Sequence, residues 1–359
     1  MKLNRFCIVL LFFLAVTSVA FSQGQILSGR VIDTETGEPI HNTEIFISGT
    51  TVGCTTDALG QFSIKPPFLP CILIANHVSY EAYVKPIDST NNLMIELQPS
   101  VYRIGGVSVA GKDRRKRNLR FFYAHFIREN QHDIQILNDS VLVFERDDMS
   151  FKAHCSDPLL IENDFLGYRI TVIIDEFSVT VHDGPTGEQL PLNSGRGGEI
   201  SNLKGYFYYE PLEESIKDKS EIFEENRRSA YYGSYRHFLK ALYDADFSDQ
   251  GFALEPFPKD SIPFYQIKGG GALLDAKQYL INVDSLHVTY YFDNDQKPVP
   301  EKYVNTLNYV FRRGSAIYPT KQAFVVRKNG TSPKLTFTIR GAMTIKNFAN
   351  SLPEDYTPE

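Results

Sequence analysis

The amino-acid sequence predicts a mainly β protein, in which an N-terminal β-sandwich is followed by a larger antiparallel β-rich domain with one or two helices. Short strand-like runs separated by turn residues fill positions 29–64, and further strand-like runs recur from residue 133 to the C-terminus. Apolar residues at helical spacing occur in only a few stretches. The regular alternation of strand and helix that builds a parallel sheet is therefore missing.

Residues 1–22 have the composition of a secretory signal peptide. Lys2 and Arg5 precede an apolar run, and small residues follow it. A membrane-spanning helix needs about 20 consecutive apolar residues, and this run is shorter. We therefore expect the segment to be cleaved and the mature chain to be exported.

The charge and length of the mature chain limit the classes of partner. The formal net charge is −6 at pH 7, and removal of residues 1–22, which carry Lys2 and Arg5 but no acid, makes it −8. A mildly acidic chain is a poor partner for nucleic acid, because DNA and RNA attract basic surfaces. The roughly 337 residues that remain are enough for two or three domains with cores of their own.

Three cysteines remain in the mature chain, Cys54, Cys71 and Cys155. Export permits a disulfide between Cys54 and Cys71, which lie within one small domain. Their strand-like surroundings favour buried thiols instead, because cysteine packs as a small apolar residue. The sequence has no Cys-x-x-Cys pair, so it indicates neither a metal site nor redox chemistry at these residues.

Residues 29–64 contain three short strands and two turns. In the first turn Asp33 and Gly37 supply turn chemistry that the interior of a helix or strand would not tolerate. In the second turn Asp57 can bind its own backbone and Gly60 can adopt a positive φ. The residues that follow alternate between apolar and polar, as a half-buried strand requires. This pattern is typical of a small β-sandwich.

The same pattern resembles the carboxypeptidase regulatory-domain-like module, a transthyretin-like and Ig-like β-sandwich found in some metallocarboxypeptidases and in many outer-membrane receptors of Gram-negative bacteria. The resemblance extends over residues 26–99. The residues that carry it are Gly29, Val31, Asp33, Thr36-Gly37-Glu38-Pro39, Gly49-Thr50, Gly53, Thr56-Asp57, Gly60 and Phe62. It implies a module that holds or presents other groups and has no catalytic residues of its own. It also implies a protein of the periplasm or the outer membrane.

The first domain is expected to occupy residues 24–100, with further strands between residues 71 and 97. Residues 101–111 are predicted to form another β segment and resemble the piece that follows this module in outer-membrane receptors. The roughly 250 residues that remain are too few for the 22-stranded barrel of those receptors, and they lack its series of amphipathic strands of about ten residues. The sequence therefore argues against a transporter.

Residues 101–130 would link the two domains, and from residue 112 they combine a basic run with an amphipathic helix. Apolar residues recur at helical spacing from Leu119 to Ile127. Cations at a helix N-terminus oppose the helix dipole, so we expect the basic run to be a solvated linker that precedes the helix. It is either a plain connector or a contact for anionic lipid headgroups. The side chains available for that peripheral membrane contact are Lys112, Arg114, Arg115, Lys116 and Arg117.

Residues 131–359 consist mostly of strand-like runs and form the second predicted domain. Ser234 can cap a helix with one apolar stripe, and an acidic helical stretch from Glu213 to Arg228 precedes it. Lys328-Asn329-Gly330-Thr331 is expected to join the last two strands as a hairpin-like turn. The motif LPEDY at residues 352–356 resembles a segment of other exported proteins with the same module, and this likeness assigns no activity.

The sequence contains no evident catalytic constellation, and we expect neither a cofactor nor a metal. The connection with carboxypeptidases makes zinc the first hypothesis to test, and His41, Glu44 and His182 have suitable side chains. However, His41 and Glu44 lie in a predicted strand, where positions i and i+3 point to opposite faces. The sequence also lacks a nucleophile elbow and a phosphate-binding loop, and Gly269-Gly270-Gly271 is predicted to be a hinge or loop.

One cluster has the chemistry of a binding site, and its members are Arg228, Tyr231, Tyr232, Arg236 and His237. Tyrosine and arginine stack on sugars or aromatic groups, and arginine clamps carboxylates. The alternative is that the aromatic members belong to the core while the charged members face solvent or pair with nearby acids.

Two functions are consistent with these observations. The first is a non-enzymatic protein of the cell envelope that binds or assembles with an envelope protein or glycan. The second is an envelope hydrolase that acts on peptide or glycan, with a site in residues 131–359. A deep cleft with convergent carboxylates or histidines would favour the hydrolase, whereas a flat face lined by aromatic residues and arginine would favour binding.

Overall fold

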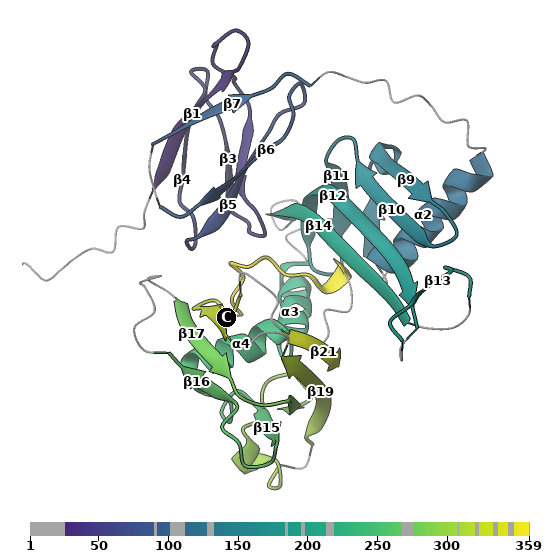
Figure 1. Ribbon diagram of the computed structural model, residues 1–359. Coiled ribbons are helices and arrows are strands. Elements are labelled where there is room, and N and C mark those ends of the chain that lie inside the picture. Colours follow the sequence, from purple (N-terminus) through teal and green to yellow (C-terminus); the bar gives the residue numbers. More distant parts are fainter. Residues whose placement is uncertain are drawn as a thin grey trace, which may run out of the picture.

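Three β-rich modules make up the protein in the computed structural model, and the C-terminal segment lies among them (Figure 1). The first module lies within residues 26–100, the second within 112–212 and the third within 235–343, and helix α3 connects the second to the third. The predicted mainly β fold class is confirmed. The structure describes residues 26–89, 92–100, 112–127, 133–183, 186–194, 198–212, 219–267, 276–307, 309–319, 323–332, 337–343 and 348–358.

Three predicted features lie outside the described residues: the signal peptide, the β segment at 101–111 and the glycine run at 269–271. Within the part of the chain that is described, no helix is long and apolar enough to cross a membrane.

The first module is a β-sandwich of two sheets, as predicted. One sheet has the strand order β4-β1-β7 and the other the order β3-β2-β5-β6. Their inward-facing residues form one core, in which Val31, Ile45 and Leu73 are fully buried. The strands are β1 (Leu27–Asp33), β2 (Glu44–Ile47), β3 (Gly53–Thr55), β4 (Gln61–Ile64), β5 (Cys71–Asn76), β6 (Tyr83–Ile87) and β7 (Asn92–Leu97).

The turns of this module are built as the sequence predicts. The Asp57 carboxylate accepts hydrogen bonds from the amides of Leu59 at 2.9 Å and Gln61 at 2.8 Å. Gly60 has a φ of +70°, and a Cβ there would lie 2.4 Å from the carbonyl oxygen of Val31. Only glycine fits this position, because any side chain would meet both backbone strain and a steric clash. The cysteines of the described residues, Cys54 among them, are free thiols.

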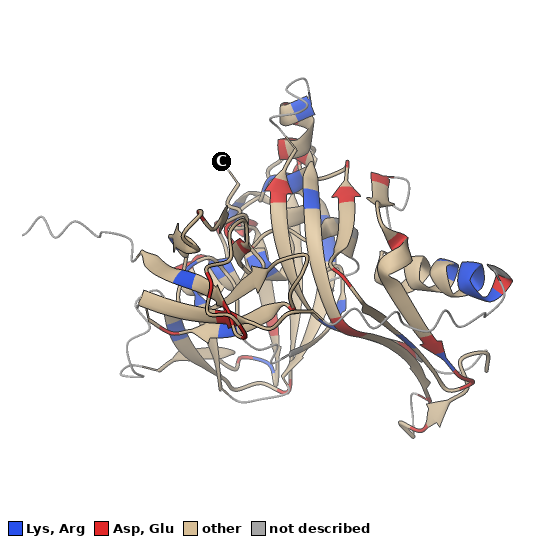
Figure 2. Cartoon of the chain, turned by 90° about the horizontal axis from the view of Figure 1, so that it is seen from above, with Lys and Arg blue, Asp and Glu red and all other residues tan. Residues whose placement is uncertain are grey.

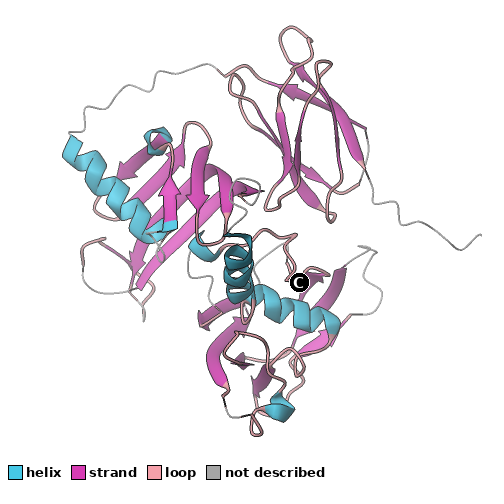
Figure 3. Cartoon of the chain, turned by 180° about the vertical axis from the view of Figure 1, so that it is seen from behind, coloured by secondary structure: helices cyan, strands magenta, loops and turns pink. Residues whose placement is uncertain are grey.

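The second module consists of one antiparallel sheet covered on one face by helix α2 (Figure 3). Strand β12 is its centre and pairs with β10, β11, β13 and β14. The rings of Phe122 and Phe126 on α2 meet Phe177 of β12 edge-on, at centroid distances of 5.3 and 5.6 Å. The elements are α2 (Lys112–Phe126), β8 (Ile134–Ile136), β9 (Leu142–Arg146), β10 (Ser150–Cys155), β11 (Leu159–Asn163), β12 (Tyr168–His182), β13 (Gln189–Leu190) and β14 (Gly198–Pro211).

The basic run differs from its prediction, because helix α2 already begins at Lys112 instead of after the run. Interactions with the second module outweigh the unfavourable helix dipole here. The Arg115 guanidinium donates hydrogen bonds to the carbonyl oxygens of Asp139 at 2.6 Å and Leu142 at 3.0 Å. Asp113 in the first turn further offsets the positive charge.

The third module has two sheets packed on helix α4. The first sheet has the order β15-β18-β19-β21 and the second the order β16-β17-β20. Ser234 caps α4 as predicted, and its hydroxyl accepts a hydrogen bond from the amide of His237 at 3.2 Å. The elements are α4 (Tyr235–Asp244), β15 (Phe252–Phe257), β16 (Phe264–Gln266), β17 (Ala276–Ile281), β18 (Ser285–Phe292), β19 (Phe311–Pro319), β20 (Ala323–Arg327) and β21 (Phe337–Gly341).

The residues predicted to form one large β-rich domain hold two separate hydrophobic cores, one in each of these modules. The predicted hairpin at Lys328-Asn329-Gly330-Thr331 is wrong in its pairing. The turn itself forms, because Gly330 has a φ of +78° and the Arg327 amide donates to the Thr331 carbonyl at 2.8 Å. However, β20 pairs with β17 while β21 pairs with β19, so the strands on either side belong to different sheets.

A turn of the first module extends the edge of β14 in the second. The Gly49 amide donates to the Phe207 carbonyl at 2.7 Å, and the Tyr209 amide donates to the Thr50 carbonyl at 3.1 Å. These are the backbone bonds of a short strand added to a sheet edge. The two modules are therefore joined by main-chain hydrogen bonds as well as by the chain itself.

Candidate functional site

Four of the five residues predicted to bind a ligand lie together where α3 (Ser220–Tyr231) ends and α4 begins. The His237 ring lies 5.2 Å from the Tyr231 ring and 5.3 Å from the Tyr232 ring, centroid to centroid. The Arg236 guanidinium lies 5.7 Å from the centre of the Tyr231 ring. The fifth residue, Arg228, is on the last turn of α3 and is half-buried.

Arg236 binds the C-terminal segment of the chain itself, residues 351–356. Its guanidinium donates to the carbonyl oxygens of Pro353 at 2.5 Å and Glu354 at 2.6 Å, and also to that of Tyr356. Its Nε donates to the carbonyl oxygen of Asn329 at 3.2 Å. The sequence predicted that this arginine binds a carboxylate, whereas its hydrogen bonds in the structure go to carbonyl oxygens of the chain itself.

The same segment contacts the other two modules. The Asp355 carboxylate accepts hydrogen bonds from the amide and the hydroxyl of Thr51 in the first module, at 3.1 and 2.6 Å. The Ser351 and Tyr209 hydroxyls, the latter on β14 of the second module, share a hydrogen bond at 2.8 Å. The Tyr356 hydroxyl donates to the Glu224 carboxylate on α3, also at 2.8 Å. One extended stretch of chain thus fastens all three modules together.

We call the place where the C-terminal segment contacts the three modules the junction. Glu354 and Arg327 form an ion pair there. The two side chains approach within 3.3 Å, and the arginine also donates to the Pro70 carbonyl of the first module at 2.9 Å. Desolvation raises the pKa of Glu354, and the positive charges of Arg327 and Arg236 oppose that rise. The pKa of Glu354 is raised overall, so desolvation outweighs the two cations at this site.

His237 is a buried, neutral member of the cluster. Its Nδ1 accepts a hydrogen bond from the Gly233 amide at 3.1 Å, so Nε2 carries the proton and donates to Gln250 Oε1, also at 3.1 Å. Burial lowers the pKa of His237 to about 4. Both ring nitrogens are already used, and an external ligand for this cluster remains a prediction.

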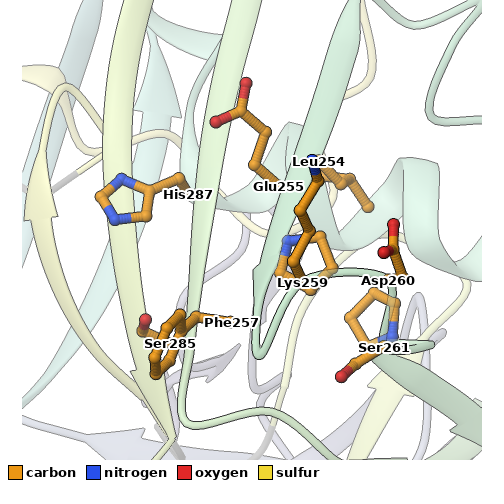
Figure 4. A pocket seen from close by; sticks show the side chains of 10 residues that line it. Leu254, Glu255, Phe257, Lys259, Asp260, Ser261, Ser285 and His287 are labelled. Carbon is orange, nitrogen blue, oxygen red and sulfur yellow. The ribbon is translucent and has the colours of Figure 1, made fainter.

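A groove of about 860 Å³ opens elsewhere on the third module (Figure 4). The side chain of Phe257 lies in it and is 60% exposed. Glu255 and His287 stand side by side on the neighbouring strands β15 and β18. The residues that line the groove are Leu254, Glu255, Pro256, Phe257, Lys259, Asp260, Ser261, Pro263, Ser285 and His287.

Part of the groove lining, Glu255, Phe257, Ser285 and His287, belongs to the face of the β15-β18-β19-β21 sheet that points away from α4, which we call the outer face. Along β18 the buried residues alternate with more exposed ones, and only the buried set contacts α4. Strand register forms a row across the outer face, in which Glu255 pairs with His287 and His287 with Ala316. Ala316 in turn pairs with Arg340.

A second row on the outer face carries aromatic rings. Phe257 pairs with Ser285, and Tyr318 pairs with Thr338. Ser285 and Tyr318 lie on the adjacent strands β18 and β19, so the two aromatic residues stand two strands apart, about 10 Å at the usual strand spacing. The outer face therefore combines a flat aromatic and hydroxyl-bearing row with a charged row.

The residues of the zinc hypothesis do not meet. His41 and Glu44 are in the first module, and His182 is at the end of β12 in the second. Within the described ranges, no group of three or more His, Cys, Asp or Glu side chains is arranged to hold a metal ion.

Comparison with protein-family models matches residues 27–109 to the CarboxypepD_reg-like domain. The matched residues include the β-sandwich described above. The first module is a CarboxypepD_reg-like domain. Comparison with curated protein sequences finds no match. The suspected resemblance is thus confirmed for the first module, and the match does not extend to the second and third modules.

Solved structures that match this chain include two proteins from Bacteroides species. A candidate carbohydrate-binding protein from Bacteroides uniformis ATCC 8492 is 9% identical, with coverage of 84% of this chain and 98% of that one and a TM-score of 0.19. A DUF3823 family protein from Bacteroides ovatus ATCC 8483 is 10% identical, with coverage of 52% and 96% and a TM-score of 0.18. At such TM-scores the likeness assigns neither fold nor ligand.

The exposed cations of α2 lie on the second module and not on the CarboxypepD_reg-like domain. Figure 2 shows them gathered towards the N-terminal end of that helix. Arg114, Lys116 and Arg117 are exposed, whereas Arg115 is held by the carbonyl oxygens described above. Three cations on one short stretch remain available for an anionic surface.

The outer face was not among the sequence-predicted sites. The alternation of polar and apolar residues in β18 was visible in the sequence and identifies a strand with one exposed face. The sequence does not reveal which strands lie next to it. Only the strand pairing brings Glu255, His287 and Arg340 into one row.

Proposed function

We propose that the protein is a non-enzymatic binding or assembly component of the bacterial cell envelope, and that the outer face of its third module binds a glycan. Export through the N-terminal segment would place it in the periplasm or at the outer membrane. The CarboxypepD_reg-like domain supports a role in binding, because this kind of module carries no catalytic residues of its own.

The observation that carries the proposal is the exposed Phe257 ring in a groove that also carries charged and hydroxyl side chains. An aromatic ring with 60% of its surface in water is a candidate ligand contact. Hydroxyl, carboxylate and ammonium groups from Ser261, Asp260 and Lys259 line the same groove. Sugars present both an apolar ring face and many hydroxyls, so a site that pairs an aromatic ring with hydrogen-bonding groups suits them.

The exposed cations of α2 support a second contact within the same function. Arg114, Lys116 and Arg117 would attract anionic headgroups of the membrane, with each cation contributing about 1 kcal/mol near the surface. This attraction would hold the protein peripherally while the third module engages its ligand.

The test is calorimetric titration of the mature chain with a panel of soluble envelope oligosaccharides. We expect binding by the native chain and a loss of about tenfold in affinity in Phe257→Ala, because the ring contact is removed. Leu59→Ala is the matched control, because Leu59 is also apolar and 58% exposed but belongs to the first module. No binding to any oligosaccharide, or equal binding by Phe257→Ala, would contradict the proposal.

One observation favours the alternative of an envelope hydrolase. Glu255 and His287 are directly opposite each other in the groove, and a carboxylate beside an imidazole can serve in acid–base chemistry. Chromatography of the bound oligosaccharide after long incubation separates the two functions. Shorter products that disappear in Glu255→Gln would establish the hydrolase, whereas an intact ligand supports binding alone.

A further inference from the structure

Arg340 is a cation on the outer face that the fold leaves available. Its guanidinium is exposed and lies 5.5 Å from the centre of the Tyr318 ring. Within the described part of the chain it makes no ion pair, whereas Arg236 and Arg327 are bound to carbonyl or carboxylate oxygens. Stacking on the tyrosine ring holds the guanidinium in place while its hydrogen-bonding edge stays open.

The residue beside Arg340 leaves space for a ligand. Ala316 separates Arg340 from His287 in the row across the sheet, and its methyl group is much shorter than the side chains on either side. Two positions along β19, at Gly314, no heavy atom lies within 4 Å of the place a Cβ would occupy. The sheet therefore carries only a methyl group at Ala316 and no side chain at Gly314, with the longer side chains of His287 and Arg340 on either side of Ala316. We call this place the dip.

The shape and chemistry of this dip fit a single carboxylate. A guanidinium donates two parallel hydrogen bonds to a carboxylate, and an imidazole from the opposite side can donate a third. Tyr318 borders the dip with a ring on which a sugar can stack. In the groove, which shares His287 with the dip, Glu255 and Asp260 would repel a continuous polyanion, so the favoured ligand carries spaced negative charges.

We propose that the dip over Ala316 binds the carboxylate of an acidic sugar, with Arg340 as its main partner, His287 opposite and the sugar ring on Tyr318. The inference rests on the proposed function, because it names the class of glycan for the same face. Phe257, about 10 Å from Tyr318, then stacks on another ring of the same chain. The favoured ligand is thus an oligosaccharide that contains an acidic sugar.

The experiment compares two forms of one ligand. A hyaluronan tetrasaccharide, in which glucuronic acid alternates with a neutral amino sugar, and its carboxyl-reduced form are titrated into the mature chain by calorimetry. We expect the acidic form to bind about tenfold more tightly than the reduced form, because only the acidic form makes charge-assisted hydrogen bonds. In Arg340→Gln the two forms should bind equally, at the affinity of the reduced form.

Two further variants keep the test specific. Arg312→Gln is the matched control, because Arg312 is an exposed arginine on the same strand as Ala316 and should not alter the ratio of the two affinities. Gly314→Phe should abolish binding of both forms while the thermal unfolding temperature stays close to that of the native chain, because no heavy atom lies within 4 Å of the place a Cβ would occupy there.

The outcomes separate this inference from the proposed function. Equal affinity for the acidic and the reduced forms in the native chain would overturn the acidic-sugar inference and leave glycan binding in place. Absence of binding by both forms would overturn this inference, while the oligosaccharide panel decides the proposed function independently. A preference for the acid that survives in Arg340→Gln would show that the carboxylate lies elsewhere.

Discussion

Replacement of Arg236 by alanine should release the C-terminal segment from the rest of the protein. The side chain makes four hydrogen bonds to carbonyl oxygens, three of them within residues 353–356. A hydrogen bond to a charged group contributes about 1.5–3 kcal/mol, but the segment is partly exposed and water replaces part of the loss. We therefore expect the free energy of opening the segment to fall by about 2–4 kcal/mol, well below the sum of the bonds.

Amide hydrogen exchange measures this opening directly. The Glu354 amide donates to the Gly49 carbonyl at 2.6 Å, so it exchanges only when the segment leaves the first module. A loss of 2–4 kcal/mol corresponds to exchange that is about 30-fold to 1,000-fold faster. Arg228→Ala is the control, because Arg228 is a half-buried arginine at the end of the adjacent helix and belongs to the same predicted cluster. Its replacement should leave the rate within about threefold of the native one.

A truncation that ends the chain at residue 350 tests whether the two effects are coupled. If Arg236 acts through the segment, Arg236→Ala should lower the unfolding temperature of the full chain but should have little further effect in the truncated chain. Unchanged exchange at Glu354, or equal effects of the substitution in both backgrounds, would refute the reasoning.

Three other predictions follow from buried groups and close contacts. Burial lowers the pKa of His237 to about 4, below the ordinary value of 6.5. Its contribution to the stability of the folded state is therefore fully present above pH 6.5 and is lost as the pH falls towards 4. The free energy of unfolding, measured with urea, should fall by up to about 3 kcal/mol over this pH range, and His237→Gln should remove this fall. Gly53→Ala places a Cβ 2.5 Å from the Tyr208 hydroxyl and should lower the unfolding temperature, whereas Gly314→Ala should not. Burial raises the pKa of the Cys71 thiol to about 11, so alkylation by iodoacetamide at pH 8 should be slow until the chain is unfolded.

The first module was predictable because its signals are local. Asp57 and Gly60 lie within four positions of each other, and the hydrogen bonds that form their turn involve only neighbouring residues. Helix α4 was predictable for the same reason, since Ser234 and the apolar stripe are contiguous in the sequence. The residues that specify these elements are therefore close together in the sequence.

The junction was not predictable, because its contacts join residues that are far apart in the sequence. Thr51 and Asp355 are separated by 304 positions, and no pattern around either residue identifies the other. The tyrosine and arginine cluster indicated a sugar, aromatic or carboxylate ligand, but the sequence does not show that Arg236 binds residues 353–356. The start of α2 was misplaced for a related reason, since the carbonyl oxygens that hold Arg115 lie more than twenty positions away along the chain.

The two faces of the β15-β18-β19-β21 sheet have different roles. One packs on α4, which holds the C-terminal segment, and the other carries the proposed ligand site. On one face Leu286, Val288 and their neighbours pack on α4, the helix whose Arg236 holds the C-terminal segment. His287 lies between those two residues in sequence and points to the outer face. The sheet therefore stands between the junction and the proposed ligand. It follows that Arg236→Ala should weaken the junction without changing glycan affinity, while Arg340→Gln should weaken affinity without changing exchange at the junction. A single substitution that altered both would mean that the two faces are coupled through the sheet.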